Sequence, residues 1–130
     1  MLFRSTHVKP HGALYNRAAG DEALARAIAR GVARFSKGVT LVGLAGSKML
    51  DVFGEEGFTI AREGFADRAY KDDGTLRARS LPGALIEDPA EAAAQAVRLA
   101  RSGTIDTLCV HGDTPGAAAI ASAVAKALIL

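Results

Sequence analysis

Few of the residues that mark a secreted or membrane protein are present in this sequence. Its single cysteine, Cys109, cannot form an intrachain disulfide, which fits a chain kept in a reducing cytoplasm. No apolar run is long enough to cross a membrane, and the first residues lack the apolar middle of a signal peptide. We therefore expect a cytoplasmic protein, with Cys109 packed in a core rather than acting as a catalytic thiol.

The chain also lacks a large excess of positive or negative residues. The formal net charge is only +2 at pH 7, which is too small to indicate nucleic acid or a membrane surface as a partner. The basic row Arg26, Arg30 and Arg34 recurs at helical spacing, and we predict a solvated helix face for it. Aromatic residues are also scarce, with five Phe, two Tyr and no Trp.

The remaining composition is that of an ordinary soluble protein. Hydrophobic residues make up 49% and charged residues 23% of the 130 positions. A chain of this length is expected to form a single domain, residues 1–130, which buries roughly two-thirds of the surface of the unfolded chain.

Residues 8–16 contain a wide variety of polar functional groups for a stretch of this length. They bring together an amine, an imidazole, a phenol and an amide, from Lys9, His11, Tyr15 and Asn16, in a run broken by Pro and Gly. A polar turn would explain each of these residues singly. Turn chemistry does not call for Lys, His and Tyr together, so the set favours a ligand site at the end of a strand expected over residues 3–8.

The rest of the chain alternates predicted helices and strands. Helices are expected from residue 21 to Gly38, over 48–55 after an N-cap at Ser47, over 89–101 after an N-cap at Asp88, and from a cap at Thr114 to the end of the chain. Strands are expected over 39–45, 58–62 and 107–110, and residues 63–83 are expected to form a long irregular loop. This alternation of strands and helices is typical of parallel β/α units, and it predicts an α/β fold.

Two of the helices show a regular apolar stripe. Leu24, Ile28, Val32 and Phe35 recur along the first helix, and Ala117, Ile120, Val124 and Leu128 recur along the last. Each stripe predicts the face that its helix buries.

Polar clusters follow several of the expected strands. In parallel α/β folds the strand ends converge on one rim, so clusters that are distant in sequence are expected to share one pocket. Tyr15, Phe65 and Tyr70 would supply its apolar part. The predicted site residues are Lys9, His11, Tyr15 and Asn16; Asp67, Arg68, Tyr70 and Arg79; and His111, Asp113 and Thr114.

Residues 8–16 closely resemble the central motif of the LamB/YcsF family, whose members include one component of the ATP-dependent 5-oxoprolinase. Residues 41–47, 65–84 and 110–115 resemble further stretches of the same family in the same order. The resemblance implies a seven-stranded (β/α) barrel of the glycoside hydrolase/deacetylase type, of which this chain would form about half. Family members are about twice as long, and their amino-terminal half has no counterpart in these 130 residues.

The resemblance also implies a reaction, the opening of 5-oxo-L-proline to L-glutamate with hydrolysis of ATP, carried out together with 5-oxoprolinase subunits B and C. Under that reading Arg68 or Arg79 binds the substrate carboxylate. Lys9 neutralises developing charge. His11 or His111, oriented by Asp67 or Asp113, acts as general base on water. Tyr15, Asn16, Tyr70 and Thr114 are expected to contact the substrate.

Three further expectations accompany this reading. A half-barrel leaves unpaired strand edges, so the chain is expected to pair with a polypeptide that supplies the other half, or to self-associate. The alternative class is a truncated, non-catalytic binding or assembly module. A metal-dependent deacetylase, with His11, His111 and Asp113 as ligands, is a third reading, although no His-x-x-x-His spacing supports a metal.

Overall fold

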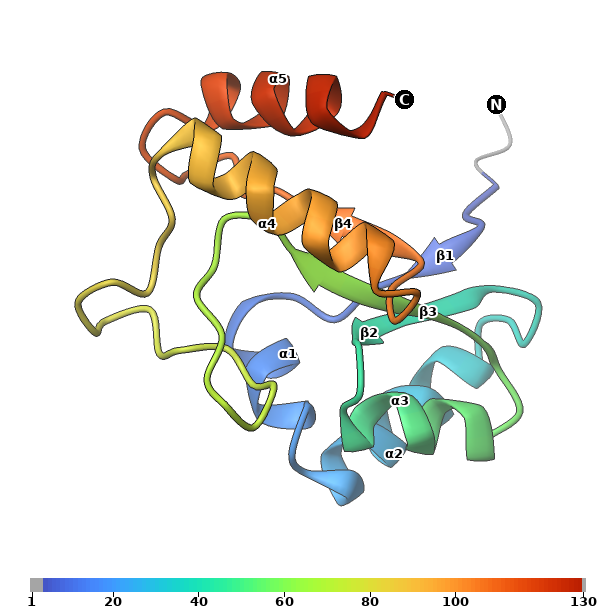
Figure 1. The fold of residues 1–130 in the computed structure, drawn as a ribbon. Helices are drawn as coiled ribbons and strands as arrows, with labels where there is room; N and C mark the ends of the chain where they lie inside the picture. Colours follow the sequence, from blue (N-terminus) through green and yellow to red (C-terminus); the bar gives the residue numbers. More distant parts are fainter. Residues whose placement is uncertain (1–3, 130) are drawn as a thin grey trace. The chain divides into compact units, whose positions relative to one another are not determined.

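The computed structural model describes residues 4–129, and the chain divides into two compact units, residues 1–62 and 63–130 (Figure 1). Strands and helices alternate along most of it. In chain order the elements are β1 (His7–Val8), α1 (Gly12–Ala18), α2 (Glu22–Ala33), β2 (Thr40–Leu44), α3 (Lys48–Glu55), β3 (Thr59–Phe65), α4 (Pro89–Arg101), β4 (Thr107–Cys109) and α5 (Ala117–Leu128).

The first unit is built on a parallel pair of strands. β1 pairs with β2 in the register His7 to Thr40 and Val8 to Leu41. The strand expected over residues 3–8 is shorter than predicted, because its described part is extended into the ladder only at His7–Val8, and Phe3 lies outside the described residues. The strand expected over 39–45 is confirmed as β2.

Local capping chemistry places α3 where the sequence predicts it. The Ser47 Oγ accepts a hydrogen bond from the Leu50 N–H at 3.3 Å, so one of the unpaired amides of the first turn is satisfied. Gly57, with φ of 88°, follows the end of the helix in the left-handed region that favours glycine. The helix packs on β2 so closely that a Cβ added to Gly43 would lie 2.9 Å from the Met49 Cε.

The predicted buried stripe of α2 is wrong at its end. Phe35 is 75% exposed, because the helix ends at Ala33 and helical spacing no longer holds beyond it. The fully buried positions are instead Ala25 and Ala29, and α2 packs against α3. Small side chains at these positions allow close approach of the two helices.

The basic row of α2 is largely solvated, as predicted, since Arg30 and Arg34 are exposed and Arg26 is half-buried, and it also forms ion pairs. Arg26 donates to Glu55 and to Glu56 at 2.8 Å each, and Arg30 contacts Glu56 at 3.3 Å. These ion pairs join α2 to the end of α3. Because most of the partners are partly exposed, we expect them to add specificity to the helix pairing and little stability.

In the second unit the end of β3 runs parallel to β4, with Glu63 opposite Thr107 and Phe65 opposite Cys109. Helices α4 and α5 lie side by side and contact each other (Figure 1). Asp88 caps α4 as predicted, because its side chain accepts from the Ala90 and Glu91 amides at 2.7 and 3.3 Å. The core between these elements consists of Ala66, Ala92, Ala96, Ile120 and Val124.

The inner stripe predicted for α5 is confirmed at its centre. Ile120 is fully buried and Val124 is 6% exposed, and burial of each contributes roughly 1.5–3 kcal/mol. Leu128, in the last turn, is 37% exposed, so the stripe does not continue to the end of the helix.

The loop expected to be irregular, residues 63–83, is largely ordered by hydrogen bonds. Its first residues complete β3, and residues 67–69 then pair antiparallel with 84–86 through bonds between Ala69 and Ala84 and between Ile86 and Asp67 at 2.9 Å each. A small hairpin follows, in which Arg77 donates to Ala69 and the turn contains Gly74 with φ of 83°. The segment therefore holds its side chains in defined positions.

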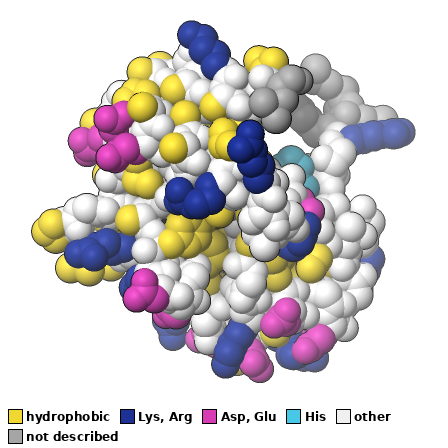
Figure 2. Space-filling model, viewed as in Figure 1, with side chains coloured by type: hydrophobic (Ala, Val, Ile, Leu, Met, Phe, Trp, Pro, Cys, Tyr) yellow, Lys and Arg dark blue, Asp and Glu magenta, His cyan; other side chains and the backbone are white. Residues whose placement is uncertain are grey.

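The surface carries both signs of charge. Figure 2 shows acidic and basic side chains interspersed over the face in view, as the small net charge leads one to expect. Among residues 4–129 no helix has the length and apolar character that crossing a membrane requires.

Candidate functional site

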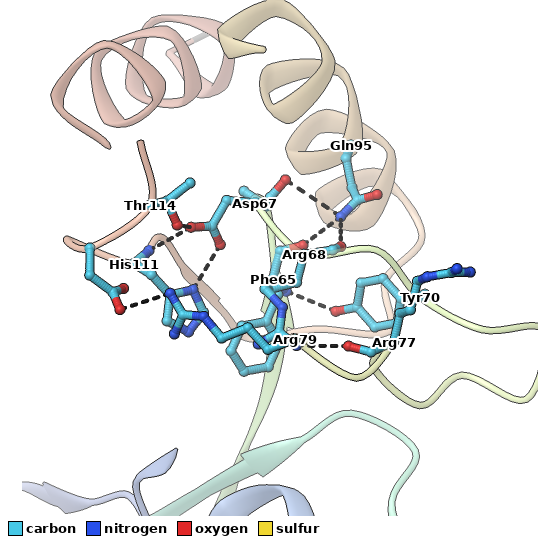
Figure 3. Close-up of polar contacts among 11 residues, drawn as sticks. Phe65, Asp67, Arg68, Tyr70, Arg77, Arg79, Gln95, His111 and Thr114 are labelled. Carbon is cyan, nitrogen blue, oxygen red and sulfur yellow. Dashed lines mark hydrogen bonds and ion pairs between the residues drawn. The ribbon is translucent and has the colours of Figure 1, made fainter. Parts of the chain in front are cut away.

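Asp67 lies at the centre of a polar network in the second unit (Figure 3). Its carboxylate accepts three hydrogen bonds. The His111 N–H and the Thr114 hydroxyl donate to Oδ2 at 2.8 and 2.7 Å, and the His111 Nδ1 lies 2.9 Å from Oδ1. Although Asp67 is fully buried, these donors compensate its charge, as a buried carboxylate requires.

The network keeps Asp67 ionised. Burial is the largest single influence and raises the pKa of the carboxyl, but the hydrogen bonds from the His111 ring, the His111 amide and the Thr114 hydroxyl together outweigh it. The pKa of Asp67 is therefore lowered below its usual value. At neutral pH the side chain is a carboxylate that can only accept hydrogen bonds.

The charge on Asp67 decides the state of His111. Because an ionised carboxylate cannot donate, Nδ1 must carry the proton in the 2.9 Å contact. In the neutral ring the Nε2 atom is then the one with a free lone pair. The ring stacks on Phe65, with centroids 5.5 Å apart and planes inclined by 11°, and its side chain is 22% exposed. His111 is thus oriented, partly accessible and able to accept a proton at Nε2.

The backbone that presents Asp67 is held from α4. The Gln95 amide nitrogen donates to the carbonyls of Phe65 and Arg68 at 2.7 and 2.8 Å, on either side of Asp67 (Figure 3). Arg98 donates to the Gln95 oxygen at 3.2 Å, which fixes the orientation of the amide. The Tyr70 hydroxyl accepts the Phe65 N–H at 2.8 Å. The turn after β3 is therefore held on both sides of the carboxylate.

Thr114 does not cap α5, which corrects the prediction made from the sequence. The N-cap is Gly116, with φ of 75° and no side-chain cap bond. The Thr114 hydroxyl is instead committed to Asp67, and Asp113 pairs with Arg79 at 2.7 Å. That hydrogen bond from Arg79 is the main cause that lowers the pKa of Asp113, although both side chains of the pair are largely exposed.

Arg68 differs from Arg79 in its surroundings. It is only 4% exposed, its Nη2 donates to the Arg77 carbonyl at 2.9 Å, and its buried Nε has no hydrogen-bond partner. Burial, and next the charge of Arg79, lower the pKa of Arg68. The second unit thus brings seven predicted site residues into one region: Asp67, Arg68, Tyr70, Arg79, His111, Asp113 and Thr114.

The other predicted site residues lie in the first unit. The Lys9 ammonium is 5.8 Å from the centre of the Tyr15 ring, so these two are neighbours. Residues 13–16 are helical rather than part of a turn, since α1 begins at Gly12 with His11 as its N-cap. His11 and Asn16 are exposed and Tyr15 is buried. That Lys9 and His11 share a pocket with His111 stays a prediction.

Two contacts of the network were not found from the sequence. Gln95 is a polar residue on the face of α4 that also carries Ala92 and Ala96, and this position inside an apolar stripe was the available signal. Phe65 was singled out as a pocket aromatic, but its stacking on His111 was not foreseen. Over residues 4–129, no group of three or more His, Cys, Asp or Glu side chains is placed to hold a metal ion.

Comparison with known proteins relates the chain to one family. The pattern that defines the LamB/YcsF family matches residues 3–129. The protein named as the A subunit of 5-oxoprolinase in Methylococcus capsulatus is 54% identical over 91% of the chain and 50% of its own length. Its namesake from Pyrococcus furiosus is 46% identical over 94% of the chain and 52% of its own length. The chain thus spans about half the length of the curated relatives it matches.

A solved structure extends the likeness to the fold. The crystal structure of the lactam utilization protein from Thermus thermophilus matches 93% of the chain at 40% identity, with a TM-score of 0.79. The match covers 54% of that protein. The predicted fold class, parallel β/α units corresponding to about half of this family's fold, is thereby confirmed.

Proposed function

Because the chain belongs to the LamB/YcsF family, we propose that it is part of an ATP-dependent 5-oxoprolinase, which opens 5-oxo-L-proline to L-glutamate while ATP is hydrolysed to ADP and phosphate. The names of its relatives, which refer to 5-oxoprolinase and to lactam utilization, support this reaction class. The chain spans about half of those proteins, so it would supply part of the site.

The pairing of Asp67 with His111 carries the proposal. Ring opening of a lactam needs water to attack a carbonyl carbon that amide resonance makes a poor electrophile. A base that removes a proton from this water lowers the barrier, and a positioned histidine typically contributes roughly 10²–10⁴-fold. His111 is held through Nδ1 by the Asp67 carboxylate and has Nε2 for the proton. Asp67 also stabilises the imidazolium that forms, as the carboxylate does in related triads.

The remaining chemistry involves the nucleotide and the leaving nitrogen. ATP, when bound in the complex, would supply a phosphoryl group to the lactam oxygen, which makes the ring carbonyl carbon a better electrophile. The sequence has no Gly-x-x-x-x-Gly-Lys-Ser/Thr loop, so we assign no nucleotide-binding role to residues of this chain. One water adds to the ring carbon, the ring C–N bond breaks, and the nitrogen takes up a proton and becomes the amino group of glutamate. A second water releases the phosphoryl group as inorganic phosphate and leaves the free carboxylate.

Partners follow from the same proposal. The relatives are named as one lettered component of 5-oxoprolinase, which points to an assembly of several subunits. We propose 5-oxoprolinase subunits B and C as partners, together with a polypeptide that corresponds to the other half of the family's length, or a second copy of the chain. Lys9 and His11 keep their proposed roles in charge neutralisation and proton transfer, and Tyr15 and Asn16 in contacting the substrate.

An ATP-dependent assay tests the proposal. The chain is combined with the other subunits and a first-half polypeptide, and glutamate and ADP are measured with 5-oxoproline as substrate. We expect equimolar glutamate and ADP, and loss of both with His111→Gln. The matched control is His7→Gln, which changes an exposed histidine. Absence of glutamate formation from the complete mixture, or full activity of the His111→Gln variant, would overturn the proposal.

A further inference from the structure

Arg68 is a buried cation that uses only part of its hydrogen-bonding capacity. A guanidinium has five N–H donors in a planar fork. Among the described residues the Arg68 side chain donates to one neutral group, the Arg77 carbonyl, and its buried Nε–H has no acceptor. A charged side chain that is only 4% exposed is costly unless it is paired, so this arrangement calls for an anion.

The carboxylates that act on Arg68 are committed elsewhere. Asp67 accepts from the His111 amide, the His111 ring and Thr114, so each of its oxygens already has at least one donor. Asp113 is bonded to Arg79 at 2.7 Å. Neither makes an ion pair with Arg68 among the described residues. The counter-ion that Arg68 lacks is therefore expected to come from a ligand.

A second cation lies nearby. Arg79 is close enough for its charge to act on Arg68, and Figure 3 shows the two side chains together beside His111. Two guanidinium groups beside a candidate base are suited to a small planar anion, because each can bind carboxylate oxygens with directed N–H donors. The fork of an arginine fits both carboxylate and phosphate. We take the carboxylate as the ligand group because the substrate of the proposed reaction carries one, and phosphate is the competing probe in the test below.

We infer that Arg68 is the receptor for the carboxylate of a small-molecule ligand and that Arg79 is a second cation which exchanges Asp113 for that ligand. The identification of the ligand as 5-oxoproline rests on the proposed function. This assignment decides between the two arginines that the sequence left open.

In this inference the ligand reaches Arg68 past the exposed pair of Arg79 and Asp113, whose charges both act on Arg68. The Arg79 and Asp113 side chains are 44% and 68% exposed. An ion pair of such exposure contributes about 0–1 kcal/mol. Opening it therefore costs little, whereas a carboxylate bound at Arg68 gains a charge-assisted bond in a site removed from water. Asp113 thus acts as an internal competitor for the ligand.

Titration calorimetry on the 130-residue chain tests the inference with two ligands of the same ring that differ at the carboxylate group. 5-Oxoproline is compared with its carboxamide, which has the same ring without the negative charge. We expect the carboxamide to bind at least about tenfold more weakly, because it lacks the charge-assisted hydrogen bond. Inorganic phosphate serves as a third probe. Equal binding of acid and amide, tighter binding of phosphate than of 5-oxoproline, or no binding of 5-oxoproline would each overturn the inference.

Three variants complete the test. Arg68→Gln should lose the preference for acid over amide, with circular dichroism as the check on folding. Asp113→Asn should bind 5-oxoproline up to about fivefold more tightly, because the competitor of Arg79 is neutralised. Asp72→Asn makes the same charge change at an exposed position of the hairpin turn and should leave affinity unaltered. If Arg68→Gln does not fold, the inference is tested by the affinity of Asp113→Asn for 5-oxoproline and by the comparison of 5-oxoproline with its carboxamide.

The outcome is separable from that of the proposed function. Binding of 5-oxoproline that depends on Arg68, without turnover in the complete complex, supports the carboxylate site and refutes the reaction. Turnover that persists in Arg68→Gln with an unchanged KM supports the reaction and refutes the site.

Discussion

Replacing Asp67 by Asn is the sharpest test of the network, because it keeps the shape of the side chain and removes its charge. The amide has one oxygen and one NH₂ group. Two donors, the His111 N–H and the Thr114 hydroxyl, converge on Oδ2, so the amide oxygen is expected there. The NH₂ group then faces His111 Nδ1, which must accept. The ring proton is expected to move to Nε2, where it blocks the lone pair that a general base needs.

The magnitude follows from the three bonds. Each is made to a charged acceptor and is worth about 1.5–3 kcal/mol, and neutral hydrogen bonds are about half as strong. Because Asp67 is fully buried, solvent does not screen this difference. Burying a neutral amide costs less than burying a carboxylate, which offsets part of the loss. We expect the free energy of unfolding to fall by about 2 kcal/mol, and turnover of the complete complex to fall by the order of 10⁴-fold.

Two measurements check this prediction. Nitrogen-15 NMR of the imidazole rings reports which nitrogen carries the proton, and with three histidines in the chain the His111 signals can be assigned by comparison with His111→Gln. Chemical denaturation gives the loss of stability. If His111 keeps its proton on Nδ1 in Asp67→Asn, or if turnover is unchanged while the tautomer has switched, the reasoning about the Asp67–His111 pair is refuted.

Three further predictions concern stability. The folded-state pKa of Asp67 is lowered, so its contribution to stability is present above its unfolded-state pKa of about 4 and is lost as pH falls through the lowered value. The difference in unfolding free energy between the wild type and Asp67→Asn should therefore shrink as pH falls from about 4 to 2, and a difference that stays constant over this range would contradict the assignment. Gln95→Met leaves the buried carbonyls of Phe65 and Arg68 without their donor and should lower the free energy of unfolding by about 2–4 kcal/mol. A loss below about 0.5 kcal/mol, the size of an ordinary surface change, would show that the two hydrogen bonds of Gln95 are dispensable. Gly43→Ala places a Cβ 2.9 Å from the Met49 Cε, which can move, and 3.2 Å from the Leu50 Cγ, which is less free to move. Because both side chains are buried, we expect overpacking that costs about 1–3 kcal/mol and lowers the melting temperature. The control Gly31→Ala changes an exposed helical position with open space and should stabilise the protein by about 0.5–1 kcal/mol.

Features that depend on neighbouring residues were predictable. The caps at Ser47 and Asp88 involve a side chain and an amide two or three residues away, so the sequence contains both partners. Gly57 and Gly103, which follow α3 and α4, have positive φ and obey a rule that is equally local. The predicted order of strands and helices is confirmed for the same reason, apart from α1, which was not predicted.

Features that depend on distant residues were mispredicted or missed. Thr114 has the sequence context of an N-cap, but its hydroxyl bonds to Asp67, which lies 47 positions earlier. The hydrogen bonds of Gln95 reach the carbonyls of Phe65 and Arg68, which lie about 30 positions earlier. Phe35 follows the helical period in the sequence, yet the helix ends before it. Periodicity and capping rules describe single elements and carry no information about these partners.

The sequence by itself therefore determined most of the elements, the caps of α3 and α4, and the polar residues that stand at the ends of strands, because these depend on spacing along the chain. Which aspartate orients which histidine, and which arginine is left with an unused donor, was decided only by tertiary structure. The physical reason is that a carboxylate takes its charge state and its role from the donors that folding brings to it, and those donors come from residues far away in the sequence.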